Sequence, residues 1–364
     1  MALGPNDLKQ WALPPGWDAA RLMQYQLSSG ESYDDLVNDI TAGLAIANAQ
    51  LLRDPIIASL VSVGTEQTLE YRTGVSNGFE DHTEYGQPDA KRASTTGHML
   101  EPIHKDRKLG WTYDFLRKAR RSQIDADIAS AMQDLKDMWQ KAILTRLSKS
   151  TYTAVGAAGK SMPVADGGTA DSTYIPPAMP ERATAFAYTH THLQCLSGIT
   201  QANLETTVTH LWEHGYDAPY DLLIAQADLS SWANTTTMTG WVKRADGLIR
   251  YGTQTDLANV DDGYLAVIET PLGPVRVRAS ARIPTTFYFL YKSFGALDAR
   301  NVLRVVPSPT YGLGAVLLSG DHIRHYPMEN AILTSEFFLG VNDRVGAVLT
   351  RQASPGSYSD PTIA

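Results

Sequence analysis

The chain has 364 residues, of which 43% are hydrophobic and 19% are charged, a composition typical of a folded protein with a sizeable core. Its 31 basic and 39 acidic residues give a formal net charge of −8, which argues against a protein that wraps nucleic acid over its whole surface. The single cysteine, Cys195, excludes an internal disulfide, and no stretch predicts a secretion signal or a membrane span.

Residues 1–31 carry scattered tryptophan and proline without sustained periodicity, which predicts an extended arm. Apolar residues then recur at helical spacing, so we expect a helix over residues 33–52. Asp54 and Pro55 are expected to end it, because the residue before a proline avoids the helical region. The residues from 56 to 73 have the composition of β-strands.

A long polar segment, residues 74–110, comes next. A loop of this length inside a compact domain counts against a simple globular fold. We therefore interpret Thr65–Thr73 and Leu109–Leu116 as the two legs of a projecting hairpin, whose charges find their partners on another subunit. Acidic residues come first in this segment and basic residues follow, namely Glu80, Asp81, Glu84, Asp89, Lys91, Arg92, Lys105, Arg107 and Lys108.

The longest periodic segment, residues 122–147, predicts the central helix of the fold, with one broad apolar face and Ser122 as its N-cap. Four basic residues just before it oppose the helix macrodipole. Two interpretations stay open for them, a solvated face or pairing with an acidic neighbour or a phosphate. We include them among the predicted inter-subunit contacts: Arg117, Lys118, Arg120 and Arg121.

The second half of the chain is predicted to contain one helix and a larger set of strands. Residues 151–180 are rich in glycine, proline and small polar residues, which predicts a loop. A helix is expected over residues 200–214 and a buried strand over 220–229. From Tyr264 onward the pattern is mainly that of β-strands, and residues 354–364 are interpreted as a free tail.

Two motifs typical of enzymes lack the structural context that their chemistry needs. Residues 154–161, AVGAAGKS, resemble a phosphate-binding loop, which requires a strand before it and a helix after it. Residues 74–78, GVSNG, match the G-x-S-x-G nucleophile elbow, but no helical pattern follows the serine. We therefore expect neither nucleotide binding nor an activated serine.

A third motif, HLWEH at residues 210–214, matches the H-x-x-E-H pattern of zinc-dependent hydrolases. Helical geometry puts His210 and His214 on one face, opposite the apolar side chains, which predicts solvated histidines. His190 and His192, two apart on an expected strand, raise the same zinc alternative. We favour hydrated or interfacial histidines and expect no catalytic, cofactor or metal site.

The order of these elements resembles that of the major capsid proteins of tailed bacteriophages, which have the Hong Kong 97 type of fold. The resemblance is carried by the hairpin that leads into the central helix, the helix-then-strand unit TQANLETTVTHLWEHG…YDLLIAQADL, the turn pair IETPLGPVRVRASARIP and the final strand RVGAVLTRQ. It implies an α+β chain divided into an N-terminal arm with a short helix (1–60), an extended-loop hairpin (61–118), a peripheral domain with the central helix (119–200), an axial domain (201–325), and returning peripheral strands with a C-terminal tail (326–364).

The resemblance implies a structural, non-enzymatic protein without cofactors. Copies of it would assemble as pentamers and hexamers into an icosahedral shell around double-stranded DNA. The implied partners are a separate scaffolding protein, a portal, a cement protein and DNA contacted without sequence specificity, with no membrane; the implied location is the virion capsid, after synthesis in the host cytoplasm. Two alternatives stay open: an encapsulin-like nanocompartment shell, and a zinc-dependent hydrolase that uses His210, Glu213 and His214.

Overall fold

The computed structural model describes residues 33–73, 94–112, 115, 118–156, 159–179, 186, 188–243, 263–318, 331–353 and 356–364. The chain divides into two compact units. The first comprises Met1–Leu52, Ile103–Trp139 and Pro307–Phe337, and the second comprises Arg53–Pro102, Gln140–Val306 and Phe338–Ala364. None of the helices in the described ranges is long and apolar enough to cross a membrane.

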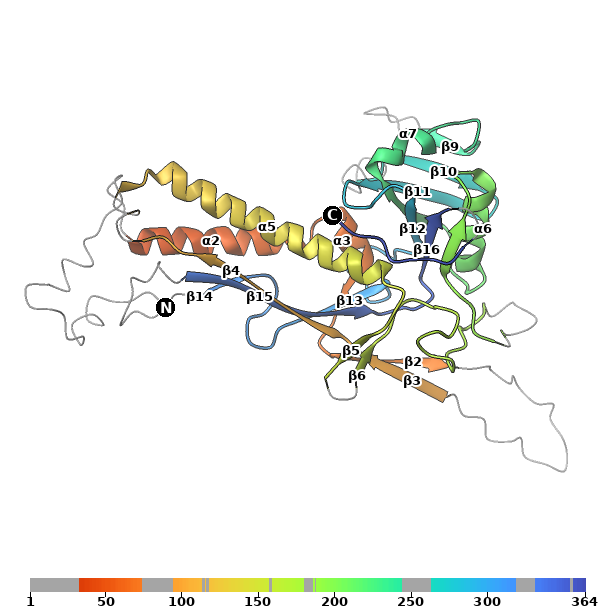
Figure 1. Ribbon diagram of the computed structural model, residues 1–364, viewed down its shortest axis with the longest axis horizontal. Coiled ribbons are helices and arrows are strands. Elements are labelled where there is room, and N and C mark those ends of the chain that lie inside the picture. The colour runs from red at the N-terminus through yellow and green to blue at the C-terminus, as the bar shows by residue number, and fades with distance from the viewer. Residues whose placement is uncertain are drawn as a thin grey trace, which may run out of the picture. The chain divides into compact units, whose positions relative to one another are not determined.

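The first unit is built on two long helices, α2 (Tyr33–Leu51) and the N-terminal part of α5 (Arg121–Ser148), which lie side by side (Figure 1). Strand β14 (Val316–Leu318) pairs antiparallel with β15 (Ala331–Val341), and β4 (Glu101–Leu109) also pairs with β15. The predicted helix over residues 33–52 is confirmed, as is the central helix.

One face of α5 is buried, because apolar residues recur every three or four positions along it. Within the first unit these residues are Ile124, Ala131, Leu135 and Trp139, of which Leu135 is the most accessible at 8%. The Trp139 ring stacks on Phe337 of β15 with ring centroids 4.0 Å apart, and its indole N–H donates to Ser335 Oγ at 3.4 Å. A residue every other position on β15 therefore fastens that strand to the helix.

The second unit is organised around a seven-stranded sheet with the strand order β7-β16-β12-β8-β11-β10-β9. Strand β8 pairs in parallel with β11 and antiparallel with β12, so it lies inside the sheet, and all six of its residues are buried. The strands are β7 (Leu193–Leu196), β8 (Tyr220–Ala225), β9 (Trp241–Lys243), β10 (Ala266–Thr270), β11 (Gly273–Ser280), β12 (Phe287–Tyr291) and β16 (Ala347–Gln352).

Helix α6 (Gln201–Trp212) packs on this sheet through Leu204, Val208 and Leu211, which share a buried cluster with the side chains of β8. Its first turn is capped by Thr200, whose hydroxyl accepts from the N–H of Asn203 at 3.3 Å. The prediction of a helix followed by a buried strand is confirmed. A 3₁₀ turn (Gln226–Asp228) and the short helix α7 (Leu229–Trp232) follow β8.

The region after α2 differs from its predicted β-structure. Asp54 and Pro55 do end α2, but they also begin a second helix, α3 (Pro55–Leu60). The Asp54 carboxylate accepts from the N–H groups of Ile56 and Ile57, and the fixed φ of proline suits the first helical position. Only the three residues of β1 (Val61–Val63) then form a strand before β2, in parallel pairing with β13 (Leu303–Pro307), a strand that the sequence interpretation missed.

The projecting hairpin has a different second leg from the predicted one. Strand β2 (Thr68–Thr73) pairs antiparallel with β3 (Ser94–Met99), in a register that joins Thr68 to Met99 and Thr73 to Ser94. The predicted leg Leu109–Leu116 is wrong, because residues 94–99 form the strand that pairs with β2. Small polar residues and Gly97 gave that stretch the composition of a loop, although its two threonines favour a strand. The residues between β2 and β3 lie outside the described ranges.

The C-terminal segment is docked onto the second unit, so its prediction as a free tail is wrong. Ile363 is buried at 3% exposure, the hydroxyl of Tyr358 donates to the carbonyl of Ser148 at 2.8 Å, and the N–H of Ser150 donates to Asp360 at 2.8 Å. The backbone of Ala364 also bonds with that of Arg282. The segment is mostly polar, so its sequence did not indicate that Tyr358 and Ile363 would be packed against the rest of the unit.

A buried histidine on β3 makes stability depend on pH. Burial, and to a lesser degree the charges of Arg344 and Arg146, lowers the pKa of His98 from 6.5 to about 4. Between these two values the unfolded chain binds a proton that the folded chain excludes, so stability that is present above pH 6.5 is lost as the pH falls toward 4. The loss from His98 is expected to reach on the order of 3 kcal/mol.

The measurement is thermal unfolding across this pH range for the wild type, His98→Gln and His104→Gln. His98→Gln removes the proton-linked loss, so its melting temperature is expected to fall less on acidification than that of the wild type. His104 is a matched control, since its side chain is about half exposed on β4. Parallel pH profiles for all three proteins would show that His98 does not resist protonation.

Candidate functional site

Three of the basic residues predicted to contact another subunit lie on β4, and they differ in exposure. Lys105 and Lys108 are exposed, whereas Arg107 is half-buried and occupied within its own unit. The Arg107 guanidinium forms an ion pair with Asp134 of α5 and donates to Ser130 Oγ at 3.2 Å. Lys105 and Lys108 are therefore available for contacts outside the chain, and Arg107 joins β4 to the central helix.

The basic residues before α5 also divide. The helix begins at Arg121 rather than Ser122, so Ser122 is not its N-cap. The Arg121 side chain bonds Asp125 at 2.7 Å and Asp39 of α2 at 2.8 Å. Of the two interpretations left open for this run, pairing with an acidic neighbour applies to Arg121, and its charge is offset at the helix N-terminus.

Two further members of this run, Lys118 and Arg120, have exposed side chains. The backbone N–H of Arg120 donates to Gln123 Oε1 at 3.1 Å, which satisfies a donor at the start of the helix while leaving the Arg120 guanidinium in solvent. The other predicted contact residues lie outside the described ranges, and their role stays a prediction: Glu80, Asp81, Glu84, Asp89, Lys91, Arg92 and Arg117.

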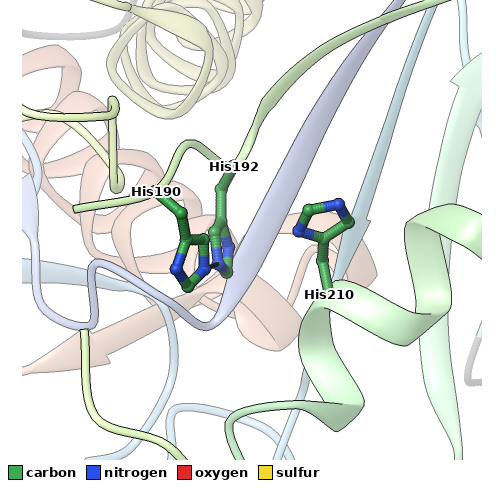
Figure 2. A group of neighbouring side chains, drawn as sticks. All are labelled: His190, His192 and His210. Carbon is green, nitrogen blue, oxygen red and sulfur yellow. Dashed lines mark hydrogen bonds between the residues drawn. The ribbon is translucent and has the colours of Figure 1, made fainter. Parts of the chain in front are cut away.

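A cluster of four histidines, which we call the histidine cluster, lies in the second unit and consists of His190, His192, His210 and His214. His190 and His192 come from the loop just before β7, not from a strand as predicted. His210 is in the last turn of α6, and His214 follows its end. Figure 2 shows His210 on the helix facing the two loop histidines.

The loop is held in this position by backbone hydrogen bonds with residues 165 and 166. Asp166 and Thr191 form an isolated antiparallel bridge, and the N–H of His192 donates to the carbonyl of Ala165 at 2.7 Å. The turn after α6 is set by Gly215, whose φ of +85° favours glycine. These local structures bring the two loop histidines to the two histidines at the end of α6, 18 to 24 positions later in the chain.

The imidazoles of the histidine cluster approach one another closely. Nε2 of His192 lies 2.9 Å from Nε2 of His214, and Nε2 of His190 lies 3.2 Å and 3.0 Å from these two atoms. Ring nitrogens of His190, His192 and His210 all lie within 4.8 Å of one another. The phenyl ring of Phe186 lies against His190 and His214, with centroid distances of 4.4 and 5.2 Å.

The cluster is more buried than sequence reasoning indicated. His192 has no exposed surface, and the other three side chains are half-buried. Burial, followed by the neighbouring charges of His214 and His190 when they are protonated, lowers the pKa of His192 well below 6.5. Burial also lowers the pKa of His210, and Glu213 opposes this effect. The prediction that His210 and His214 lie on a solvated face is therefore wrong.

His210 and His214 are more buried than predicted because of a tertiary contact. The helical projection places His210 and His214 opposite the apolar face of α6, and they are indeed away from Leu204 and Val208. The loop before β7 covers this second face, which no property of the helix itself reveals. The signals in the sequence were the H-x-x-E-H match at residues 210–214 and the spacing of His190 and His192, two residues apart.

The resemblance of residues 154–161 to a phosphate-binding loop has no structural counterpart. Strands β5 (Thr153–Val155) and β6 (Gly159–Ser161) form a short antiparallel hairpin. A phosphate-binding loop instead connects a strand to a helix N-terminus. The G-x-S-x-G match at residues 74–78 lies outside the described ranges.

Comparison with known proteins places this architecture. No family model matches the chain, and no curated protein matches it. A solved structure described as Mycobacterium phage Patience matches it with a TM-score of 0.65 and 20% sequence identity, over 93% of this chain and 93% of that one. The chain has the Hong Kong 97 type of phage capsid fold.

Two other solved structures are similar at lower scores. The capsid of Ralstonia phage GP4 has a TM-score of 0.46 at 12% identity, over 82% of this chain and 91% of that one. The holo-SrpI encapsulin complex from Synechococcus elongatus has a TM-score of 0.43 at 10% identity, over 84% of this chain and 90% of that one. These scores are too low to favour either kind of shell. The α+β capsid fold predicted from the sequence is confirmed.

Proposed function

We propose that this protein is the major capsid protein of a tailed bacteriophage, a structural subunit that assembles with copies of itself into an icosahedral shell around double-stranded DNA. The observation that carries the proposal is the match to a phage structure over 93% of both chains at a TM-score of 0.65. Because a shared fold does not by itself define a function, assembly has to be measured directly.

We also propose the partners of this protein and its location. Shell subunits meet as pentamers and hexamers, and each copy presents the same patches repeatedly. A scaffolding protein, a portal and a cement protein are the further partners, and the packaged DNA is contacted without sequence specificity. The protein is made in the host cytoplasm and ends in the virion capsid. The expected divisions into arm, extended loop, peripheral domain and axial domain belong to the same proposal.

The direct test is expression of the full chain, with sedimentation velocity followed by negative-stain electron microscopy. Closed particles of defined size, or irregular shells that become regular when a scaffolding protein is supplied, are the expected result. A stable monomer or dimer under all conditions of salt and concentration would contradict the proposal. An encapsulin-like shell would also form particles, and is distinguished by packaging a protein cargo instead of DNA.

The exposed lysines of β4 are expected to contribute to assembly. Reversing Lys105 and Lys108 to glutamate changes the charge of one subunit by four units without disturbing the internal Arg107–Asp134 pair. Each exposed ion pair contributes at most about 1 kcal/mol and is screened by salt, but a shell repeats the contact many times. We expect the double variant to assemble poorly at low salt while its circular dichroism stays like that of the wild type.

Arg107 is left out of this variant because its loss would weaken the fold as well as any contact between subunits. A matched control is Lys141→Glu, which reverses an exposed lysine on α5. If the yield of particles from Lys105→Glu/Lys108→Glu equals that of the wild type and the control across a salt series, the β4 lysines do not lie in an interface.

A further inference from the structure

The histidine cluster brings the Nε2 atoms of His190, His192 and His214 within 3.2 Å of one another. Nδ1 of His192 lies 2.9 Å from the carbonyl oxygen of Ala347, and Nδ1 of His214 contacts the carbonyl oxygen of Pro177. A carbonyl oxygen only accepts, so each of these Nδ1 atoms must carry the proton and donate it. In the neutral imidazole, Nε2 of both rings is then the nitrogen with the lone pair.

When both rings are neutral, these two lone-pair nitrogens face each other at 2.9 Å with no proton between them. His190 Nε2 lies 3.2 Å and 3.0 Å from the same two atoms and has at most one proton to share. A proton bridges two nitrogens, whereas a metal ion contacts three at once. The three atoms form a triangle, and a metal ion bound over it would accept a lone pair from each ring at once.

We propose that the histidine cluster is a binding site for a divalent transition metal ion, with zinc as the expected occupant. Zinc bound to imidazole nitrogens at about 2.0–2.1 Å in a tetrahedron requires the ligand nitrogens to lie about 3.3 Å apart. The observed separations of 2.9 to 3.2 Å need only a slight expansion to meet that geometry. Imidazole is a ligand that suits zinc better than magnesium or calcium.

The second shell of the cluster also fits a metal site. Histidines that bind metals almost always donate their other ring N–H to a carbonyl or carboxylate, which fixes the ring and the tautomer. His192 and His214 both do so, to carbonyls from segments remote from their own. The carbonyl of Ala347 belongs to β16, so the site is anchored to an interior strand of the sheet.

His210 supplies the fourth ligand. Its ring nitrogen lies within 4.8 Å of those of His190 and His192, and its Nδ1 is buried without a hydrogen-bond partner among the described residues. Coordination requires this nitrogen to move closer to the other three, to the remaining corner of the tetrahedron. Four protein ligands are typical of structural zinc sites, whereas catalytic sites keep one position open for water or substrate.

The expected role is therefore to fasten the loop before β7 to the end of α6. This assignment does not favour the hydrolase alternative, although both use His210 and His214. With four imidazoles around the ion, no position is left for a water that Glu213 would activate. The inference is also independent of the capsid proposal, because it concerns contacts within one unit of one chain.

The test uses the full chain without a polyhistidine tag, purified, stripped with a chelator and titrated with Co²⁺ as a spectroscopic probe. Tetrahedral nitrogen ligation gives visible d–d absorption that saturates at about one equivalent per chain. Loss of a carbonyl partner alone lowers metal affinity by about 10–100-fold, so His214→Ala is expected to weaken Co²⁺ binding at least tenfold. Zinc content measured on the unstripped protein gives the native occupant.

His192→Ala should abolish the signal, but this fully buried side chain is also important for packing. His214→Ala at a half-exposed position keeps the test decisive, provided that its circular dichroism matches the wild type. His104→Ala removes an exposed histidine on β4 and should bind Co²⁺ like the wild type. A second expected result is that a chelator lowers the melting temperature of metal-loaded wild type but not of His214→Ala.

His210→Ala tests whether His210 is the fourth ligand. A weaker spectrum that still saturates would make His210 the fourth ligand of a site held mainly by the other three. No Co²⁺ signal in the wild type, or equal affinity in the wild type and His214→Ala, would overturn the proposal and leave the cluster as a hydrogen-bonded group of neutral rings. Particle formation, measured separately, reports on the capsid proposal and not on this site.

Discussion

Replacement of Trp139 by alanine is expected to lower the free energy of unfolding by about 3–5 kcal/mol, the range typical of a buried tryptophan. Trp139 has no exposed surface, stacks on Phe337 and donates its indole N–H to Ser335. Alanine leaves a cavity between α5 and β15 that the packed neighbours do not fill, because helix and strand are each held by their own backbone hydrogen bonds. The measurement is urea or thermal unfolding followed by circular dichroism.

Trp212→Ala is the matched control, since the same substitution is made on a side chain that is 39% exposed at the end of α6. It is expected to cost clearly less than Trp139→Ala. Equal losses in the two variants would show that the buried face of α5 does not stabilise the first unit more than an exposed tryptophan does. An insoluble Trp139→Ala protein would be compared through the milder Phe337→Leu, for which a smaller loss in the same direction is expected.

Replacement of Asp221 by alanine is the second large effect, expected at about 3–5 kcal/mol. Asp221 is fully buried near the start of β8, where its carboxylate bonds Arg276 at 2.6 Å and Arg278 at 3.4 Å on the neighbouring strand β11. Alanine leaves the largely buried guanidinium of Arg278 without this carboxylate. The cost arises from the remaining buried charge, which is why removing one partner is worse than replacing the whole group.

A control for Asp221→Ala is Asp298→Ala, which removes a carboxylate from the exposed pair with Arg300 and should change stability little. The triple variant Asp221→Leu/Arg276→Leu/Arg278→Leu removes all three charges. It is expected to recover much of the stability lost in Asp221→Ala, because no buried charge is left behind. A triple variant less stable than Asp221→Ala would show that the loss in Asp221→Ala does not arise from the arginine charges that lack the Asp221 carboxylate.

Elements with strong periodicity were predictable from the sequence. The apolar face of α5 and the sequence of α6 followed by fully buried β8 follow from spacing alone, since a helix that buries one face needs apolar residues every three or four positions. The boundaries of the elements, and whether a short element is a helix or a strand, were less predictable from the sequence. Helix α3 depends on one capping carboxylate and a proline, which outweighed the β-branched residues that favoured a strand.

The sequence by itself determined the fold class, the central helix and the order of elements that resembles a phage capsid subunit. Only the tertiary structure decided which charges are used internally and which side chains meet. Arg107 and Lys108 are neighbours on one strand, yet the first pairs with α5 and the second is exposed, because alternate residues of a strand point to opposite faces.

The histidine cluster also depends on tertiary contacts. Its four rings come from a loop and a helix end, and each segment alone predicts solvated histidines. Their convergence is set by a bridge to Asp166 and by hydrogen bonds to the carbonyls of Ala347 and Pro177, contacts between residues remote in the chain that no local pattern encodes.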